Sequence, residues 1–210
     1  MATDFQVLQR YKKAWNLDIV LKPVYLGGVM ISSGNKPPIT VANKGLWMNK
    51  IDMPLQSKFW QIPIKFPDSF PVQTMHVVRL LRVIADEAPE KLLAVTECFY
   101  EQIWTPKSKG ATAAAKPENF RSVIPSSLVS DDKLKQWIEK SQADENKNRI
   151  KEESKQLVEQ SGAFGMPWME VVNDRGEETR FFGADRFEIM AFFLGKKWNG
   201  PFPANDSAKL

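Results

Sequence analysis

The sequence has only one cysteine and one histidine among its 210 residues. Cys98 has no second cysteine with which to form a disulfide, and a C-x-x-C redox motif is excluded, which favours a reducing compartment. Cys98 and His76 cannot build an N/S metal cage by themselves, so we expect no metal cofactor. A Ser-His-Asp triad would need His76, and no G-x-S-x-G turn accompanies it. We expect both residues to have structural roles on helices.

Long apolar runs are also missing. No segment approaches the roughly eighteen apolar residues of a membrane span, and the first residues are periodic and acidic, unlike a signal or transit peptide. The net charge is +4, from 29 basic and 25 acidic residues that are interleaved along the chain. This pattern indicates a solvated surface and no nucleic-acid face. A mildly positive field suits small anionic ligands.

Helical periodicity predicts most of the elements. We expect helices at 4–14, capped by Asp4, around 77–84 and 92–103, from Ser130 onward, over the polar run 144–161, and from Ala184-Asp185-Arg186 to Gly195. Alternating apolar residues predict strands at 17–22, 168–172 and 179–183. The last two should form a hairpin that turns at Gly176. We expect a long surface loop at 24–46 and a mobile connection at 105–120.

The hexapeptide GAFGMP at 162–167 lies where the last helical run gives way to a strand. A proline that enters a strand behind two glycines suits a cis bond or a tight turn, in which the preceding backbone faces outward. Such an edge could pair with a peptide-like ligand, although the hexapeptide alone is equally consistent with a structural turn. Asp185 and a helix N-terminus follow the hairpin and could bind the ammonium and carboxylate groups of such a ligand. Together these groups match glutathione.

With these motifs in place, the sequence resembles the kappa-class glutathione transferases, which have a DsbA-like thioredoxin fold of the α/β class with a large helical insertion. The resemblance covers nearly the whole chain. It rests on the blocks FQVLQRYKKAWNLDIVLKP, SGNKPP, NKGL, GAFGMP, FFGADR and LGKKWNGPFP in that order. It implies a discontinuous thioredoxin-like domain at 1–46 and 161–210, and an all-helical domain at 47–160.

The resemblance also implies the glutathione-binding residues. Pro167 is expected to be the cis-proline, and the Met166 backbone to pair with the cysteinyl unit. Asn35 and Lys44 should meet the other end of the tripeptide, where a lysine neutralises the glycyl carboxylate. Asp185 should bind the γ-glutamyl ammonium. Ala184 replaces the usual serine of the family, so a hydroxyl donor is lost and its backbone N–H remains.

The start of the chain departs from the family pattern. Family members have a strand and a segment like S-P-Y-S-W before the residues that match Phe5–Arg10, and the first serine of that segment stabilises the glutathione thiolate. Here only MATD occupies this place, so the position of the family serine falls upstream of Met1. The resemblance therefore predicts no catalytic hydroxyl in this chain, and Thr3 cannot replace it. It further predicts that the first strand of the sheet is missing and that the chain is a truncated form with impaired stability and activity.

Several functions follow from the resemblance. The first is a glutathione transferase that conjugates small electrophiles, or reduces peroxides, in detoxification as a homodimer. The alternatives are a non-catalytic binding or scaffold form and a glutathione-dependent isomerase of the 2-hydroxychromene-2-carboxylate isomerase type. A disulfide oxidoreductase is disfavoured by the missing C-x-x-C. The C-terminal Ala208-Lys209-Leu210 is close to the peroxisomal S-K-L signal, so we expect a peroxisomal or mitochondrial location, and otherwise a cytoplasmic one.

Overall fold

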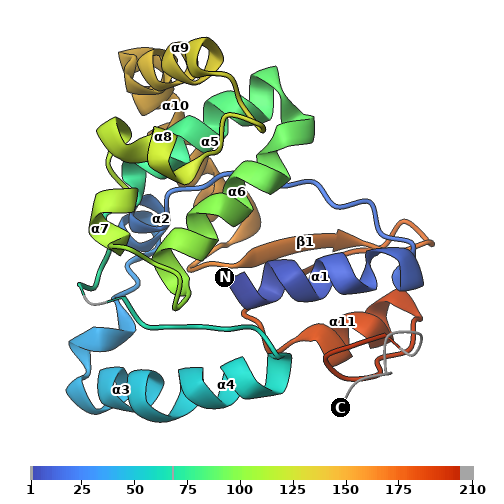
Figure 1. The fold of residues 1–210 in the computed structure, drawn as a ribbon. Coiled ribbons are helices and arrows are strands. Elements are labelled where there is room, and N and C mark those ends of the chain that lie inside the picture. Colours follow the sequence, from blue (N-terminus) through green and yellow to red (C-terminus); the bar gives the residue numbers. More distant parts are fainter. Residues whose placement is uncertain (1, 68, 204–210) are drawn as a thin grey trace.

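The computed structural model describes residues 2–67 and 69–203; Met1 and Ala208-Lys209-Leu210 therefore lie outside the described residues. The chain folds into helices and one small sheet (Figure 1). The elements are α1 (Ala2–Trp15), α2 (Leu26–Ser33), η1 (Pro38–Thr40), α3 (Ala42–Trp47), η2 (Met48–Asp52), α4 (Met53–Trp60), α5 (Met75–Glu87), α6 (Pro89–Trp104), α7 (Ala111–Ala114), η3 (Pro117–Asn119), α8 (Phe120–Val123), α9 (Asp131–Gln142), α10 (Asp144–Ser161), β1 (Trp168–Val172), β2 (Glu178–Phe182) and α11 (Phe187–Leu194).

The sheet is the predicted hairpin. β1 and β2 pair antiparallel, with Trp168 opposite Phe182 and Val172 opposite Glu178. The turn is closed by the Asn173 side chain, whose Oδ1 accepts hydrogen bonds from the backbone N–H groups of Arg175 (2.9 Å) and Glu177 (3.0 Å). Gly176 has φ +78°, a left-handed conformation that glycine adopts without a steric penalty. Local turn chemistry thus fixes the register of the hairpin.

One apolar core lies between the hairpin, α1 and α11. Inward-facing Phe181, with half-buried Met169 and Val171, packs against buried side chains of both helices. In Figure 1, α1 runs alongside β1, in front of it and slightly lower, and α11 lies below both elements. The buried members of this core are Val7, Tyr11, Trp15, Trp60, Ile62, Phe181, Phe187, Met190, Ala191 and Leu194. The apolar faces of the helices α1 and α11 and the inward face of β2 therefore pack in one core.

A second core joins the central helices. Leu80 and Ile84 of α5, Phe99 of α6 and Trp137 of α9 are almost completely buried in it. This helical part forms the upper half of the molecule in Figure 1. The two cores are separate clusters, and Trp60 and Ile62 belong to the sheet core. The domain boundaries expected from the sequence remain a prediction.

The segment after α11 is tied back to α1 by polar groups of aromatic side chains. The Tyr11 hydroxyl accepts a hydrogen bond from the Asn199 N–H (3.1 Å) and donates to the Gly200 carbonyl (2.8 Å). Trp15 Nε1 donates to the Lys197 carbonyl (3.0 Å). Burial raises the pKa of Tyr11, so the hydroxyl stays a donor at neutral pH.

Three sequence expectations about element boundaries are wrong in part. α1 begins at Ala2, so Asp4 lies inside the helix and does not cap it. Residues 17–22 form no strand within the described chain, because β1 pairs only with β2; their alternating pattern has no neighbour with which to exchange hydrogen bonds. At the other end of the chain, the last helix begins at Phe187, after Asp185 and Arg186 rather than at Ala184.

The expected loop at 24–46 is also wrong, because it contains α2, η1 and α3. Within it, Gly34 ends α2 with φ +73°, whereas Gly28 serves close packing between helices. A Cβ on Gly28 would lie 3.0 Å from the Ser154 Cβ of α10, so glycine lets α2 and α10 approach closely. Similarly, 105–120 is not a mobile connection: Ala111, Ala114 and Phe120 are buried in the helical core.

The segment from α3 to α4 is one continuous helical rod interrupted by the π-turn η2. The Met53 N–H bonds to the Met48 carbonyl, five residues back. Pro54 follows directly, and in a regular α-helix its ring would clash with the Lys50 carbonyl. The wider turn relieves that clash and continues the helix.

Glu87 joins the ends of α5 and α9. Its carboxylate accepts hydrogen bonds from Lys133 Nζ (2.9 Å), Trp137 Nε1 (2.9 Å) and Lys140 Nζ. The hydrogen bonds from Lys140, then Lys133 and Trp137, lower the pKa of Glu87 to about 2. Because the folded pKa lies below the ordinary 4.5, the carboxylate stabilises the fold above that value and loses its contribution as the pH falls toward 2.

We predict that Glu87→Gln lowers the free energy of unfolding by about 1 kcal/mol at pH 7, a value reduced by solvent screening of this partly exposed group. The difference from wild type should shrink as the pH falls from 5 to 3. Urea denaturation across this range measures it, with Glu97→Gln as the control on α6. A difference that does not depend on pH would contradict the prediction.

Candidate functional site

The hexapeptide 162–167 leads into β1, and its two glycines are required for different structural reasons. Gly162 caps α10 with φ +73°, and its N–H bonds to the Val158 carbonyl (3.0 Å). Gly165 is buried, and a Cβ there would lie 2.8 Å from the Phe182 ring. The Met166–Pro167 peptide bond is cis, which confirms the local geometry expected from the sequence.

The backbone groups of β1 point alternately to its two edges, and in the described chain its strand hydrogen bonds form only along the edge that faces β2. The Pro167 carbonyl accepts from the Gly183 N–H (3.2 Å), and the Asn173 N–H donates to the Glu177 carbonyl (3.0 Å). With the antiparallel register between them, the odd-numbered residues of β1 bond to β2 and the even-numbered ones face the other edge. Within the described chain no strand pairs with that edge. The backbone N–H and C=O groups of the even-numbered residues at this edge, Trp168, Glu170 and Val172, therefore have no strand partner. Met166, which is also even-numbered, directs its backbone groups to the same edge.

Asn35 brings the segment after α2 to this edge. Its Nδ2 donates to the Phe164 carbonyl at 2.6 Å, although 129 residues separate the two in sequence. Its Oδ1 accepts from the Lys36 N–H (2.8 Å). Both bonds fix the amide orientation beside the hexapeptide. Asn35 therefore lies beside the hexapeptide, and its expected contact with glutathione stays a prediction.

Asp185 and Ala184 reach the same end of the sheet from the other side. Gly183 bonds to Pro167, and a Cβ on Gly183 would lie 2.9 Å from Asp185 Oδ1. Asp185 is exposed and forms an ion pair with its neighbour Arg186 (3.1 Å). α11 starts two residues later, so its free N–H groups and partial positive charge lie close by.

Lys44 is exposed on α3. Among the described residues no hydrogen bond or ion pair joins it to the hexapeptide, so a role at the site requires its flexible side chain to reach a ligand. The N-terminal end of α1 lies at the end of the sheet where β1 begins (Figure 1). One region is thus surrounded by four groups: the N-terminus of α1, Asn35, the cis-proline turn and the loop that carries Asp185.

The position expected for the family's catalytic serine, upstream of Met1, lies outside the described residues. Within them, the chain enters this region as the first turn of α1, which begins at Ala2 and includes Thr3. The lack of a catalytic hydroxyl in this chain therefore stays a prediction from the family resemblance.

An aromatic cluster that the sequence analysis missed lines this region. The Phe164 ring contacts Trp168 and Phe182, with ring centroids 5.5 and 4.6 Å apart. Trp168 Nε1 is buried without a hydrogen-bond partner in the described chain. The FFG block and Gly165 were visible in the sequence, but their contact depends on the hairpin register.

The other reactive residues lie away from this region. His76 Nδ1 is 3.2 Å from Gln142 Oε1, a contact between helices. Burial, with Glu101 and Glu97, raises the pKa of the half-buried Cys98 thiol, which disfavours the reactive thiolate. In the described part of the chain, no three His, Cys, Asp or Glu side chains gather as metal ligands, and no helix there is long and apolar enough to cross a membrane.

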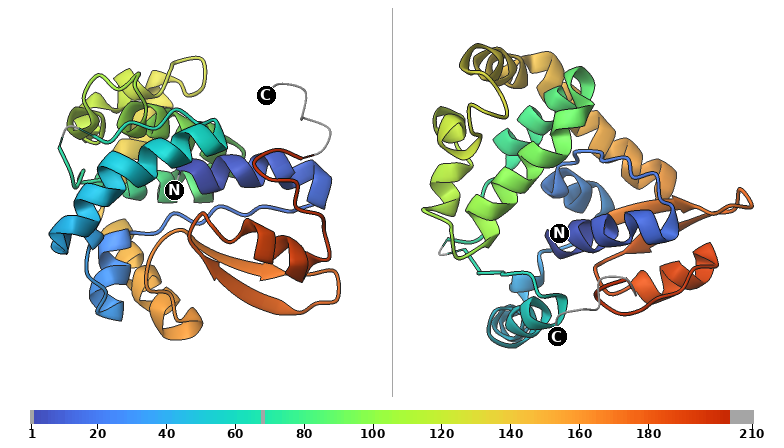
Figure 2. Two further views of the ribbon diagram at one scale, coloured as in Figure 1. Left: turned by 90° about the horizontal axis from the view of Figure 1, so that it is seen from below. Right: turned by 45° about the vertical axis from the view of Figure 1, so that its right-hand side comes forward.

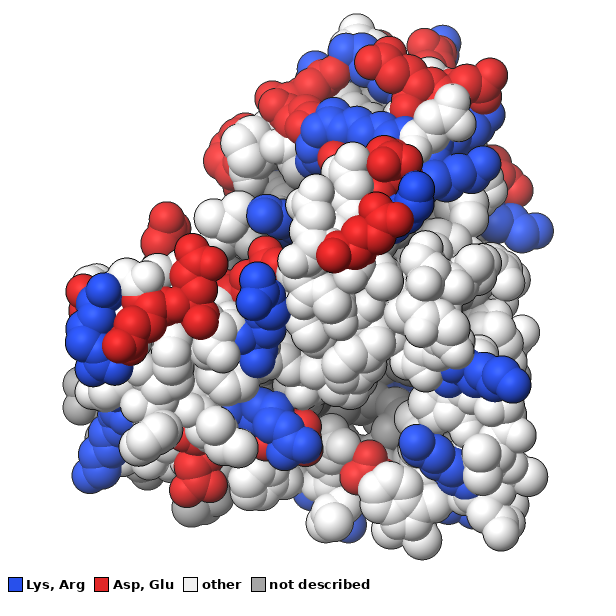
Figure 3. Space-filling view, turned by 180° about the vertical axis from the view of Figure 1, so that it is seen from behind, with Lys and Arg blue, Asp and Glu red and all other residues white. Residues whose placement is uncertain are grey.

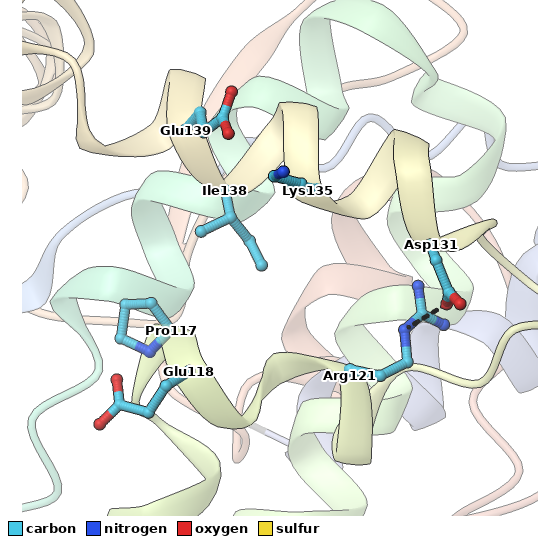
Figure 4. Close-up of a pocket in the computed structure, with 7 residues that line it drawn as sticks. All are labelled: Pro117, Glu118, Arg121, Asp131, Lys135, Ile138 and Glu139. Atoms are coloured by element: carbon cyan, nitrogen blue, oxygen red, sulfur yellow. Dashed lines mark ion pairs between the residues drawn. The ribbon is translucent and has the colours of Figure 1, made fainter.

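A shallow cavity of about 420 Å³ lies in the helical part, between η3 and α9. Arg121 pairs with Asp131 (3.0 Å) across it, and Ile138 points into it (Figure 4). Arg121 also donates to the Ile124 carbonyl (3.0 Å) and the Val129 carbonyl (3.0 Å). The arginine is therefore committed to holding the chain together, and the cavity shares no residue with the cis-proline region.

Comparison with known proteins shows which family this chain is similar to. A family model for the DSBA-like thioredoxin domain matches residues 3–195. Glutathione S-transferase kappa 1 of Homo sapiens is 32% identical over 211 residues, which cover 98% of this chain and 90% of the human protein. The Rattus norvegicus protein of the same name is 31% identical with the same coverage, and that of Caenorhabditis elegans is 29% identical over 90% of this chain and 83% of its own.

A solved structure shares the fold. The 2-hydroxychromene-2-carboxylate isomerase (HCCA isomerase) matches with a TM-score of 0.71 over 93% of this chain and 90% of its own, at 16% identity. The fold class expected from the sequence, a thioredoxin-like α/β fold with a helical insertion, is thus confirmed. The chain belongs to the DsbA-like thioredoxin family and, within it, to the kappa-class glutathione transferases.

Proposed function

We propose that this chain binds glutathione along the free edge of β1 and presents its sulfur to a small electrophile or hydroperoxide. The observation that carries the proposal is the meeting of Asn35, the cis-Pro167 turn and Asp185 at one end of the sheet. The names of the kappa relatives support glutathione as the co-substrate.

Each part of the tripeptide has a matching group in this proposal. The Met166 N–H and C=O pair with the cysteinyl backbone as an added strand would. The γ-glutamyl carboxylate meets the Ala184 N–H and the N-terminus of α11, and its ammonium meets Asp185. Asn35 and Lys44 meet the glycyl end, where the lysine supplies a positive charge. The sulfur then lies toward the N-terminal end of α1, whose partial positive charge favours a thiolate.

In the conjugation step, the thiol proton is released to solvent and the thiolate sulfur forms a bond to an electrophilic carbon. The leaving group, such as a halide, departs with the bonding electron pair. The protein contributes orientation and electrostatic stabilisation, while the chemistry belongs to glutathione. A homodimer, expected by resemblance, is part of the proposal.

The proposal predicts that Asp185→Asn weakens glutathione binding about tenfold, since one charge-assisted hydrogen bond is worth roughly 1.5 kcal/mol. Isothermal titration calorimetry with glutathione measures this. Asp174→Asn is the matched control, because Asp174 is an exposed hairpin carboxylate that pairs with Lys196 (3.0 Å). Equal losses in both variants would count against a role for Asp185.

Gly165→Ala should also weaken binding, by about fivefold, because the new methyl group would press on the Phe182 ring and shift the cis-proline turn. Adding Phe182→Leu to this variant should restore part of the affinity by removing the contact. Gly45→Ala, whose Cβ would meet Ile39 at an ordinary 3.5 Å, serves as the control. If the double variant binds no better than Gly165→Ala, the clash is not the cause.

We further propose, from the family resemblance, that turnover by this 210-residue chain is slow even where glutathione binds, because no described residue matches the family's catalytic serine. Loss of one stabilising donor typically costs a factor of about a hundred or more. The rate of conjugation to an aryl halide, compared with that of the human relative, tests this expectation. Equal rates would show that another group activates the thiol.

The fold neighbour supports a second candidate, since its title describes an isomerase. In that function the glutathione sulfur would add to a substrate carbon and leave again, so glutathione would be regenerated. Product analysis with glutathione and a 2-hydroxychromene-2-carboxylate separates the two: isomerised product without consumption of glutathione favours the isomerase. Calorimetric binding without either reaction would favour a non-catalytic binding form.

A further inference from the structure

The rod from α3 to α4 exposes a row of large apolar side chains, the stripe. Its members recur every four residues and so share one face of the rod. They are Trp47, Ile51, Leu55 and Phe59. Each is between 49% and 63% exposed, whereas the next residue, Trp60, is buried in the sheet core. A helix normally buries its apolar face, so the described part of the chain leaves the stripe without a cover.

The stripe has a basic border. Lys44, Lys50 and Lys58 are exposed on the same rod, and among the described residues no carboxylate pairs with any of them. The single acidic residue between 42 and 60 is Asp52; it is half-buried and accepts a hydrogen bond from Gln56 (2.7 Å). Seen from behind, the lower right of Figure 3, where α3 and α4 lie, shows isolated basic side chains on a largely uncharged surface. The exposed side of the rod is therefore apolar and positively charged.

α11 widens the exposed apolar surface. Ile189 is 54% and Phe192 is 86% exposed, with exposed Glu188 beside them. α11 is held next to α4 by an edge-on ring contact between Trp60 and Phe187, whose centroids are 5.8 Å apart. α3, α4 and α11 occupy the same lower side of the molecule in Figure 1, and the view from below in Figure 2 shows them together. Exposed apolar side chains of two separate helices thus lie on one side of the protein.

The composition of the rod is that of a helix at a membrane surface. Such helices combine Trp, Phe and Leu on one face with lysines at the border, and lie in the plane of the lipid head groups. Trp47 begins the stripe, and an indole ring has its preferred place at the boundary between acyl chains and water. Lysine side chains keep their methylene groups on the apolar surface while the ammonium group reaches a lipid phosphate. At 1.5 Å per residue the rod from 42 to 60 is about 28 Å long, so its lysines are spread over several head groups.

We propose that this side of the protein docks on an anionic membrane surface, with the stripe among the lipid chains and the three lysines at the head groups. Negatively charged lipids attract lysines near the surface. A second rod laid on the stripe would instead oppose lysines to lysines, and a soluble polyanion would leave the stripe in water. A single acidic helix would cover the stripe but not α11 as well, whereas a bilayer is wide and flat enough to meet both. The charge of the rod and the spread of apolar residues over two helices therefore select a lipid surface.

The docking is independent of the proposed function, because it uses no contact with glutathione. Lys44 is a candidate glutathione ligand, so the variants below change Lys50 and Lys58 instead. Binding to vesicles is measured without glutathione, and calorimetry with glutathione is measured without lipid. Vesicle binding in the absence of glutathione binding would therefore support the docking and remove the proposed function, and the converse result would do the opposite.

Co-sedimentation of the full chain with vesicles tests the docking. The chain should bind vesicles of phosphatidylcholine with one-third phosphatidylserine at least about tenfold more tightly than vesicles of phosphatidylcholine alone. Leu55→Ser should weaken binding to the anionic vesicles about tenfold, because an apolar side chain is lost from the bilayer. Ile31→Ser, which changes an 83% exposed residue on α2 outside this surface, should have no effect. Circular dichroism confirms that each variant is folded. A wild type that does not bind anionic vesicles, or equal affinities of the two variants, would overturn the proposal.

Charge substitutions test the role of the border. Lys50→Gln and Lys58→Gln should each weaken binding to anionic vesicles about fivefold, which is the contribution of one lysine near such a surface, and the loss should shrink at high salt. Glu188→Gln should strengthen binding, because it removes the exposed carboxylate beside the apolar residues of α11. Lys151→Gln, at an exposed position of α10, is the control. If it weakens binding as much as the two rod variants do, net charge alone attracts the protein and the proposed face is wrong.

The same proteins decide between the membrane and other occupants of the stripe. If Leu55→Ser separates a dimer in sedimentation velocity yet binds vesicles as the wild type does, the stripe is a contact between copies. If a helical peptide of leucine and glutamate binds the wild type but no vesicle does, the face belongs to a protein partner. If polyglutamate abolishes vesicle binding and Leu55→Ser does not weaken it, the lysines bind anions without insertion of the stripe. Each of these three results would overturn the membrane docking.

Discussion

The hydrogen bonding of β1 along a single edge constrains everything at the functional end of this molecule. Because odd-numbered residues bond to β2, the even-numbered backbone groups and Met166 are directed to the other edge. The hairpin turn at Asn173 sets the register of β1 against β2. A shift of this register by one residue would turn the even-numbered backbone groups toward β2 instead. The position at which a tripeptide could pair is therefore set by a turn at the far end of the strand.

The inner face of the same hairpin holds the helices that carry the charged groups. Phe181 lies in one core with Phe187 and Met190, and its ring centroid is 6.2 Å from that of Phe193, so the hairpin anchors α11 and Asp185 lies close to the cis-proline turn. Asn35 comes from a different direction and is held by one hydrogen bond to Phe164. The site is thus assembled from three segments that share no local sequence, around one strand end.

The parts of the fold that local chemistry specifies could be predicted from the sequence. Gly176 marked the hairpin turn, Gly195 the end of α11, and GAFGMP the cis bond, since each depends on neighbours a few residues away. The strand expected at 17–22 and the loop expected at 24–46 were wrong. Strand formation needs a partner edge, and Gly28 serves a contact with Ser154 of α10, which lies 126 residues later in the sequence. At the site, Asn35 was predicted as a ligand from the family resemblance. The contact between Gly165 and Phe182 could not be predicted, because it depends on the register of the hairpin.

The π-turn at 48–52 has a geometric effect on the exposed side of the rod. In a regular α-helix each step of four residues overshoots a full turn by about 40°, so Trp47 and Phe59 would point in directions about 120° apart. The wider turn falls short of a full rotation over four residues and so offsets this drift. A proline that would break a regular helix is thus accommodated by a turn that keeps the apolar residues closer to a straight line.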